Sequence, residues 1–304
     1  MEFQILIDDS FIDTCDTSSI SPAENKNILS LINDYEDGKW RETKFDNFIW
    51  DNIAETALSF RERESLSSHA MTQLRESAKN LRLSDKEDNI SKGSELAEIL
   101  LYGIMKHHYS ALPVVPKIFY KQNAQDNAKG ADSVHIIIND DDFTIWFGEA
   151  KFYNKIEDAR LTSIITSVKN SLQTDKLKKE NAIITNLSDI DYFIDDEELN
   201  KKIKSALSNR NSIDSLKPKL HIPILLLHEC EITKTASETN EQYIKSIIAY
   251  HKERATSYFK KQIDKLKDVY MYSEITFHLI LFPVPEKELI VNRFVKEVES
   301  FKEK

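Results

Sequence analysis

Two carboxylates and a lysine interrupt the apolar segments ADSVHIIIN (131–139) and FTIWFGEAKFY (143–153): they are Asp132, Glu149 and Lys151. Both segments are rich in β-branched and aromatic residues, which predicts two strands joined by an acidic turn. Side chains two apart on a strand share a face, so Glu149 and Lys151 project together. If the strands pair as a hairpin, Asp132 comes close to Glu149, because the turn at Asp140 and Asp141 lies about midway between them in the sequence.

Such a group of residues suits the hydrolysis of phosphodiester bonds. Asp132 and Glu149 could bind a hard cation, Mg²⁺ or Mn²⁺, through oxygen, and the backbone carbonyl of Ala150 could complete its shell. A bound metal lowers the pKa of its water and polarises a phosphate. Lys151 would orient the water or stabilise negative charge in the transition state. We therefore predict a metal-dependent phosphodiesterase site.

A helix that starts near Ser94 precedes these two strands. The segment SELAEILLYGIMKHHYSA (94–111) has a serine suited to the N-cap and apolar residues at helical spacing. It carries Glu95 and Glu98, which are three residues apart and therefore lie on roughly the same side of the helix. Either carboxylate could join the site.

The remaining elements alternate between strands and helices. HIPILLLHEC (221–230) and EITFHLILFPV (274–284) have the length and apolar character of buried strands, and helices are expected over 157–179, 241–270 and from 285 onward. This order predicts an α/β fold, in which a mixed central sheet is flanked by helices.

The first 90 residues are expected to form a mostly helical N-terminal region. MEFQILI reads as a short strand, and helices are predicted over residues 22–37 and 45–83. The polar segment SDKEDNISKG (84–93) then marks a boundary. Residues 91–304 would form the second, nuclease-like domain.

Composition limits where the protein works and what it binds. With two cysteines, an acidic N-terminus and no apolar run approaching the ~20 residues of a membrane span, a soluble, cytoplasmic protein without membrane contact is expected. The formal net charge of −10 argues against a protein that binds DNA alone through a basic face. A local patch, a metal or a partner would have to supply that contact. With only 5 glycines and no P-loop, the chain is not its own motor.

Asp132 followed by Glu149-Ala150-Lys151 on the next strand resembles the signature of the PD-(D/E)xK, or restriction-endonuclease-like, nucleases. The resemblance implies a restriction-endonuclease-like core and a Mg²⁺-dependent DNA endonuclease. It also implies an acidic residue on the first core helix, for which GSELAEILLY favours Glu98 over Glu95. Here the sequence GAD stands where that signature has PD.

The segments KGSELAEILLY, GADSVHI and FGEAKFY, behind a helical N-terminal region, also resemble the HamA family, the nuclease subunits of the Hachiman anti-phage defence system. This resemblance spans roughly residues 90–300. It implies a DNA-cleaving effector that is controlled by a helicase partner, HamB. Such a partner would also account for the acidic net charge.

Other interpretations stay open. Asp132 could be a turn residue that binds backbone amides, and Glu149 and Lys151 could be a charged pair on an exposed edge strand. The fold could also serve a catalytically silent binding or regulatory subunit, or the enzyme could be an RNase. The intact set of Asp132, Glu149 and Lys151 argues against a silent site.

Overall fold

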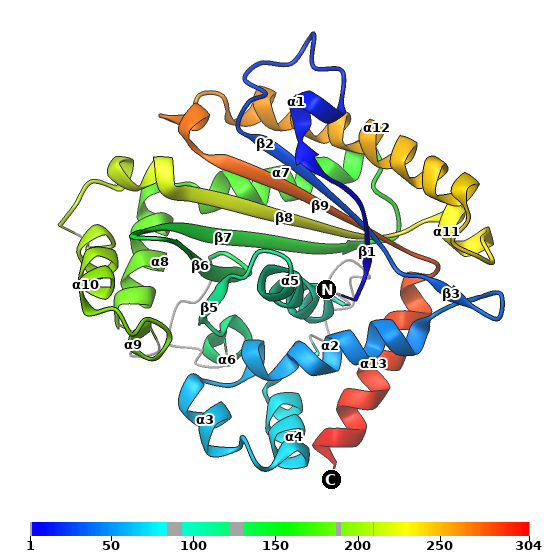
Figure 1. Cartoon of the computed structure of the whole chain (residues 1–304), viewed down its shortest axis with the longest axis horizontal. Coiled ribbons are helices and arrows are strands. Elements are labelled where there is room, and N and C mark those ends of the chain that lie inside the picture. Colours follow the sequence, from blue (N-terminus) through cyan, green and yellow to red (C-terminus); the bar gives the residue numbers. More distant parts are fainter. Residues whose placement is uncertain (1, 84–92, 122–129, 187–189, 209, 304) are drawn as a thin grey trace.

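The computed structural model of the chain describes residues 2–83, 93–121, 130–186, 190–208 and 210–303. Its centre is a seven-stranded sheet in the order β1-β2-β9-β8-β7-β6-β5 (Figure 1). The predicted mixed α/β fold is thereby confirmed. The strands are β1 (Gln4–Ser10), β2 (Lys26–Ile32), β5 (Leu112–Val115), β6 (Ser133–Asn139), β7 (Asp142–Tyr153), β8 (Leu220–Glu229) and β9 (Thr276–Val284).

The middle of the sheet is parallel and its two edges are antiparallel. β2, β9, β8 and β7 run parallel to one another, whereas β1 pairs antiparallel with β2, and β6 pairs antiparallel with both β7 and β5. Parallel strands are covered on both faces, which is why β8 and β9 are almost continuously apolar.

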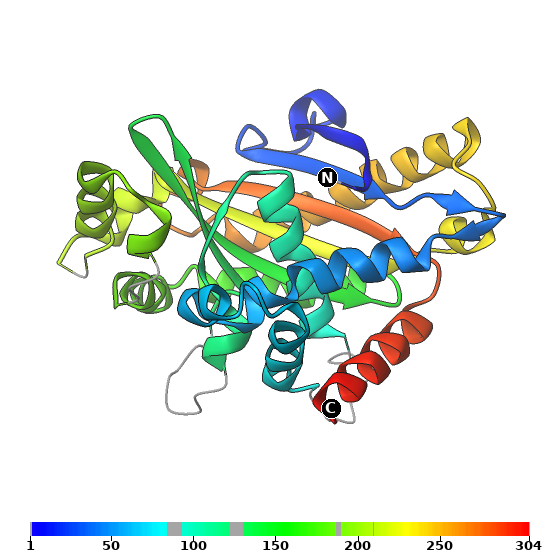
Figure 2. The same cartoon turned by 60° about the horizontal axis from the view of Figure 1, so that its bottom comes forward.

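Helices cover both faces of the sheet, and each face has its own hydrophobic cluster (Figure 2). Alternate residues of the central strands enter the two clusters, as the strand period of two requires. One face is covered by α7 (Asp158–Ser171), α8 (Thr174–Asn186), α10 (Glu197–Ala206) and α12 (Glu241–Leu266); the other is covered by α2 (Glu42–Ala57), α4 (Ala70–Asn80), α5 (Ser94–His107) and α13 (Lys287–Lys302).

Short elements complete the described chain. Apart from the hairpin of β3 and β4, they connect or cap the larger ones. They are α1 (Phe11–Thr14), β3 (Tyr35–Glu36), β4 (Lys39–Trp40), α3 (Phe60–Ser65), α6 (Lys117–Lys121), α9 (Ile190–Phe193), the 3₁₀ turns Ile213–Lys219 and Tyr272–Glu274, and α11 (Glu231–Thr235).

The N-terminal region differs from the expectation. The helix predicted over 22–37 is wrong, because Lys26–Ile32 forms β2. A short segment such as KNILSLI, with four apolar residues among seven, can be a strand or part of a helix by periodicity alone, and pairing with the distant β9 makes it a strand. The helix predicted over 45–83 is divided into α2, α3 and α4. Because β1 and β2 belong to the central sheet, a mostly helical extension describes only the part from α2 onward.

The predicted domain boundary near residue 90 lies outside the described residues. A further difference follows Val115: the strand expected through VVPKIFYKQ stops there, and Lys117–Lys121 is helical. Pro116 lacks the N–H that would continue the strand pairing. None of the helices in the described part of the chain combines the length and hydropathy that crossing a bilayer requires.

Candidate active site

The hairpin of β6 and β7 forms in the predicted register. Ser133 pairs with Gly148 at one end and Asn139 with Asp142 at the turn. The backbone N–H of Asp132 donates a hydrogen bond of 2.7 Å to the carbonyl of Gly148, which extends the pairing by one residue. Asp132 therefore lies beside Glu149.

The ammonium of Lys151 is the point on which three oxygens converge. Its Nζ lies 3.2 Å from Oδ2 of Asp132, 3.8 Å from Oε2 of Glu149 and 3.0 Å from the backbone oxygen of Ala150. Oδ2 of Asp132 also accepts a hydrogen bond of 3.1 Å from the N–H of Ala150. The structure thus brings together Asp132, Glu149, Ala150 and Lys151, as the strand pattern suggested.

These charges are largely withdrawn from solvent. The Glu149 side chain is 3% exposed, that of Asp132 15% and that of Lys151 30%. Charges buried to this degree are tolerated when they compensate one another. Burial lowers the pKa of Lys151, but the negative charges of Asp132, Glu149 and Glu98 outweigh it and raise this pKa above its ordinary value. This raised pKa favours the ammonium form of Lys151.

The two acids of α5 have different surroundings. Both carboxylate oxygens of Glu95 accept backbone hydrogen bonds, from the N–H groups of Arg82 and Leu83, each at 2.9 Å. Glu98 is 4% exposed, and its charge is among those that raise the pKa of Lys151. Of the two alternatives left open by the sequence, Glu98 is the one whose charge acts on Lys151, whereas Glu95 binds the backbone of Arg82 and Leu83.

Gly148 lets α5 approach β7 closely. A Cβ at this position would lie 2.2 Å from Oγ of Ser133 and 2.8 Å from Cδ2 of Leu101 on α5. A side chain larger than hydrogen would fit only if the Ser133 and Leu101 side chains moved away. Gly148 therefore keeps the helix that carries Glu98 against the strand that carries Glu149.

Ser167 is a contact that the sequence did not reveal. It lies on α7, and its hydroxyl donates a hydrogen bond of 2.7 Å to Oε2 of Glu149. The only signal in the sequence is a small polar residue within one turn of the buried Ile164 and Val168. Oε2 of Glu149, the oxygen nearest to Lys151, is thus also held by α7, which covers the face of the sheet opposite to α5.

The donor set fits a hard divalent cation. Two carboxylates and a backbone carbonyl are the oxygen ligands that Mg²⁺ and Mn²⁺ take, and both ions usually keep several waters. In the described part of the chain, no three or more His, Cys, Asp or Glu side chains have the arrangement of a metal site on their own. A cation here would therefore need the carbonyl of Ala150 and solvent beside the two carboxylates.

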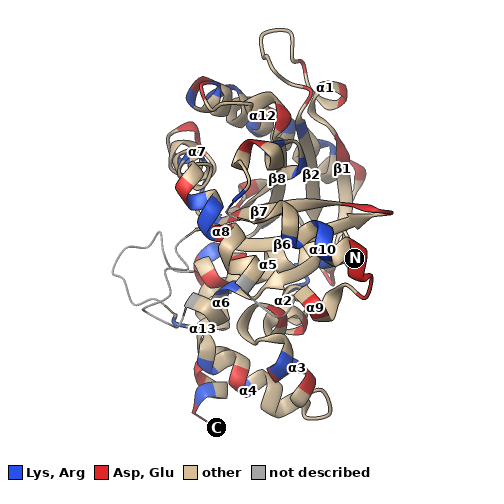
Figure 3. Cartoon of the chain, turned by 90° about the vertical axis from the view of Figure 1, so that its left-hand side faces the viewer, with Lys and Arg blue, Asp and Glu red and all other residues tan. Residues whose placement is uncertain are grey.

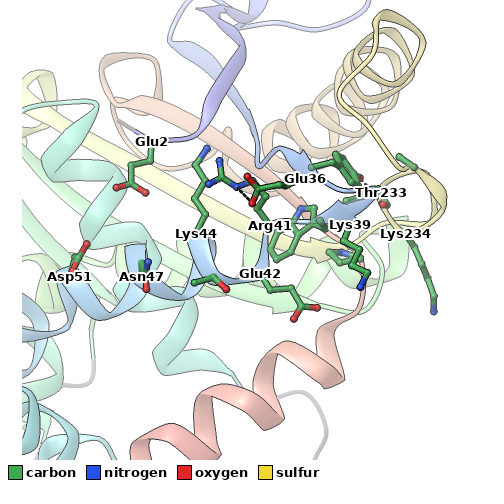
Figure 4. A pocket seen from close by; sticks show the side chains of 16 residues that line it. Glu2, Glu36, Lys39, Arg41, Glu42, Lys44, Asn47, Asp51, Thr233 and Lys234 are labelled. Carbon is green, nitrogen blue, oxygen red and sulfur yellow. Dashed lines mark hydrogen bonds and ion pairs between the residues drawn. The ribbon is translucent and has the colours of Figure 1, made fainter.

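A large depression lies elsewhere on the molecule. It measures about 1280 Å³ and lies between the β3–β4 hairpin and the start of α2 (Figure 4). Its walls carry both signs of charge, and Arg41 forms an ion pair of 3.6 Å with Glu36 across it. None of its lining residues belongs to the group formed by Asp132, Glu149, Ala150 and Lys151. Its size alone does not make it the site of chemistry.

Comparison with known proteins identifies the family. No curated protein matches the chain. The model of the HamA family matches residues 9–298, which includes β2, α5, the β6–β7 hairpin and most of α13. The chain therefore belongs to the HamA family and is an anti-phage defence protein.

Proposed function

We propose that the chain is a metal-dependent DNA endonuclease of the PD-(D/E)xK type and the effector of a Hachiman-type system, controlled by a helicase partner like HamB. The observation that carries the proposal is the convergence of Asp132, Glu149 and the Ala150 carbonyl on one cation, the ammonium of Lys151. Family membership supports the defence role.

Each residue has a distinct task in this reaction. Asp132, Glu149 and the carbonyl of Ala150 would hold Mg²⁺ or Mn²⁺, which when bound supplies an acidified water and polarises the phosphate. Lys151, a cation at neutral pH, would stabilise the charge that grows on the phosphate oxygens. Glu98 would assist by supporting the charge of Lys151.

The charge of the chain supports a partner that engages DNA. Its formal net charge is −10, and Figure 3 shows blue and red segments side by side on α8 and α10, not a continuous basic stripe. Binding to DNA depends on neutralising phosphates with Lys and Arg. A helicase subunit would supply that attraction and deliver the strand to the cluster.

The test is cleavage of supercoiled plasmid by the purified chain with Mg²⁺ or Mn²⁺, with and without the helicase subunit. We expect metal-dependent nicking in at least one of the two preparations, and its loss in Glu149→Gln. Glu157→Gln is the matched control, because the side chain of Glu157 is exposed and pairs with the exposed Lys155. Cleavage that persists in Glu149→Gln, or that needs no metal, refutes the proposal. Single-stranded RNA in parallel reactions tests the RNase alternative.

A further inference from the structure

A buried ion pair lies next to Gly130 and Ala131, which form the turn directly before Asp132. Lys117, at the start of α6, and Glu180, on α8, are joined by a contact of 2.5 Å between Nζ and Oε2. Their side chains are 0% and 5% exposed. Two elements from different parts of the chain thus meet through a charge pair inside the protein.

Glu180 also binds the backbone of that turn. Its Oε1 accepts a hydrogen bond of 3.1 Å from the N–H of Ala131, the residue directly before Asp132. The preceding residue is Gly130, where a Cβ would lie 1.6 Å from the same oxygen. The glycine of GAD therefore leaves room for a carboxylate that comes from α8.

The pair is connected in turn to the helix that carries Glu98. The N–H of Lys117 donates a hydrogen bond of 3.2 Å to the hydroxyl of Tyr102, which itself donates to the carbonyl of Val115. Tyr102 stands four residues after Glu98, about one turn further along α5. Buried hydrogen bonds therefore lead from α5 through Lys117 and Glu180 to the turn of Asp132.

We infer that Glu180, neutralised by Lys117, is a positioning residue that places the Asp132 carboxylate against Lys151 and Glu149. This inference rests on the proposed function. A buried ion pair is seldom better for stability than an apolar pair of similar volume. What an apolar pair could not provide is an acceptor for the Ala131 N–H, and that acceptor holds the backbone from which Asp132 projects.

Two double variants separate the acceptor from the charge. Lys117→Met/Glu180→Gln removes both charges and keeps a carbonyl oxygen for Ala131, whereas Lys117→Met/Glu180→Met removes the charges and the acceptor. Removal of groups that orient metal ligands typically lowers metal affinity or activity by about 10- to 100-fold. We expect the methionine pair to need that much more Mg²⁺ for half-maximal plasmid cleavage, and the glutamine pair to stay near the wild-type chain. A merely structural role would lower both melting temperatures without separating their Mg²⁺ requirements.

Amide hydrogen exchange of the peptide 130–135 provides a second readout that needs no activity. Loss of protection is expected in the methionine pair and retention in the glutamine pair. Gly130→Ala, which drives a methyl group into the Glu180 carboxylate, should reproduce the loss if the methionine pair does not fold. Equal protection and equal Mg²⁺ requirement in both double variants overturn the inference. If the wild-type chain with its partner cleaves nothing, the proposed function fails, and the exchange measurement still decides whether Glu180 holds the turn.

Discussion

The Nζ of Lys151 lies 3.2 Å from Oδ2 of Asp132, although the two residues are 19 positions apart in the chain. The same ammonium contacts Glu149 and the carbonyl of Ala150. It therefore sits among the oxygens proposed to hold the metal. A divalent cation that binds these oxygens must displace the ammonium from some of them. Metal binding is therefore expected to move the Lys151 side chain away from part of its present contacts.

Lys151→Met is expected to separate metal binding from cleavage. Without the ammonium, two carboxylates face each other uncompensated, so the protein should lose stability in EDTA and regain it with Mg²⁺. A ligand that binds only the folded state stabilises it in proportion to RT ln(1 + [L]/Kd). Cleavage should fall by at least about 100-fold, as when a group that stabilises transition-state charge is removed. Melting temperatures across a Mg²⁺ titration and plasmid nicking measure the two effects.

Lys155→Met provides the comparison for this variant, because Lys155 is exposed and pairs only loosely, at 3.7 Å, with Glu157. It should resemble the wild-type chain in both assays. A Lys151→Met protein that cleaves normally would show that the cation has no part in the chemistry.

The two acids of α5 should respond differently to the same substitution. Glu98→Gln removes a negative charge that supports Lys151, and cleavage is expected to fall by about 10-fold with little change in melting temperature. Glu95→Gln weakens the hydrogen bonds to the N–H groups of Arg82 and Leu83, which lowers the free energy of unfolding by no more than about 1 kcal/mol. Denaturant unfolding and plasmid cleavage distinguish them. The reverse pattern would assign the site to Glu95.

Ser167→Ala tests the support of Glu149 from α7. The variant removes the hydroxyl that donates to Oε2 at 2.7 Å, and we expect about a 10-fold higher Mg²⁺ requirement for cleavage. Ser171→Ala is the matched control, because that hydroxyl donates to the carbonyl of Val168 in its own helix. An unchanged Mg²⁺ requirement in Ser167→Ala would mean that Glu149 is held without it.

The sequence was most informative where the contacts are local. Asp132 and Glu149 belong to one hairpin, so alternation along each strand and the place of the turn determine which side chains meet. The parallel strands β8 and β9 were also recognisable, because strands buried on both faces are apolar throughout. These features do not depend on how distant segments pack.

Contacts between distant segments could not be predicted in this way. β2 is a strand because it pairs with β9, about 250 residues further along the chain, where Ile28 lies opposite Leu279. Glu180 reaches Ala131 across 49 positions. His228 on β8 and His251 on α12, whose Nε2 atoms lie 3.2 Å apart, are 23 positions apart in the chain. Periodicity describes each of these elements separately and contains no information about which faces meet.

Mild acid is expected to destabilise the protein partly through His135. This residue is fully buried against Tyr102, and neither ring nitrogen has a hydrogen-bond partner among the described residues. Burial lowers the pKa of His135 from 6.5 to about 3. Between these values the unfolded chain binds a proton that the folded chain does not, so stability falls as the pH drops below about 6.5. His135→Leu should remove about 1.4 kcal/mol of this loss for each pH unit between about 6.5 and about 3, since this is the free energy of one unit of pKa shift. Denaturant unfolding of both proteins from neutral to acidic pH measures the difference, and His69→Gln, at an exposed histidine, is the control.

Parallel pH profiles of His135→Leu and the wild-type chain would show that His135 is already protonated in the folded protein.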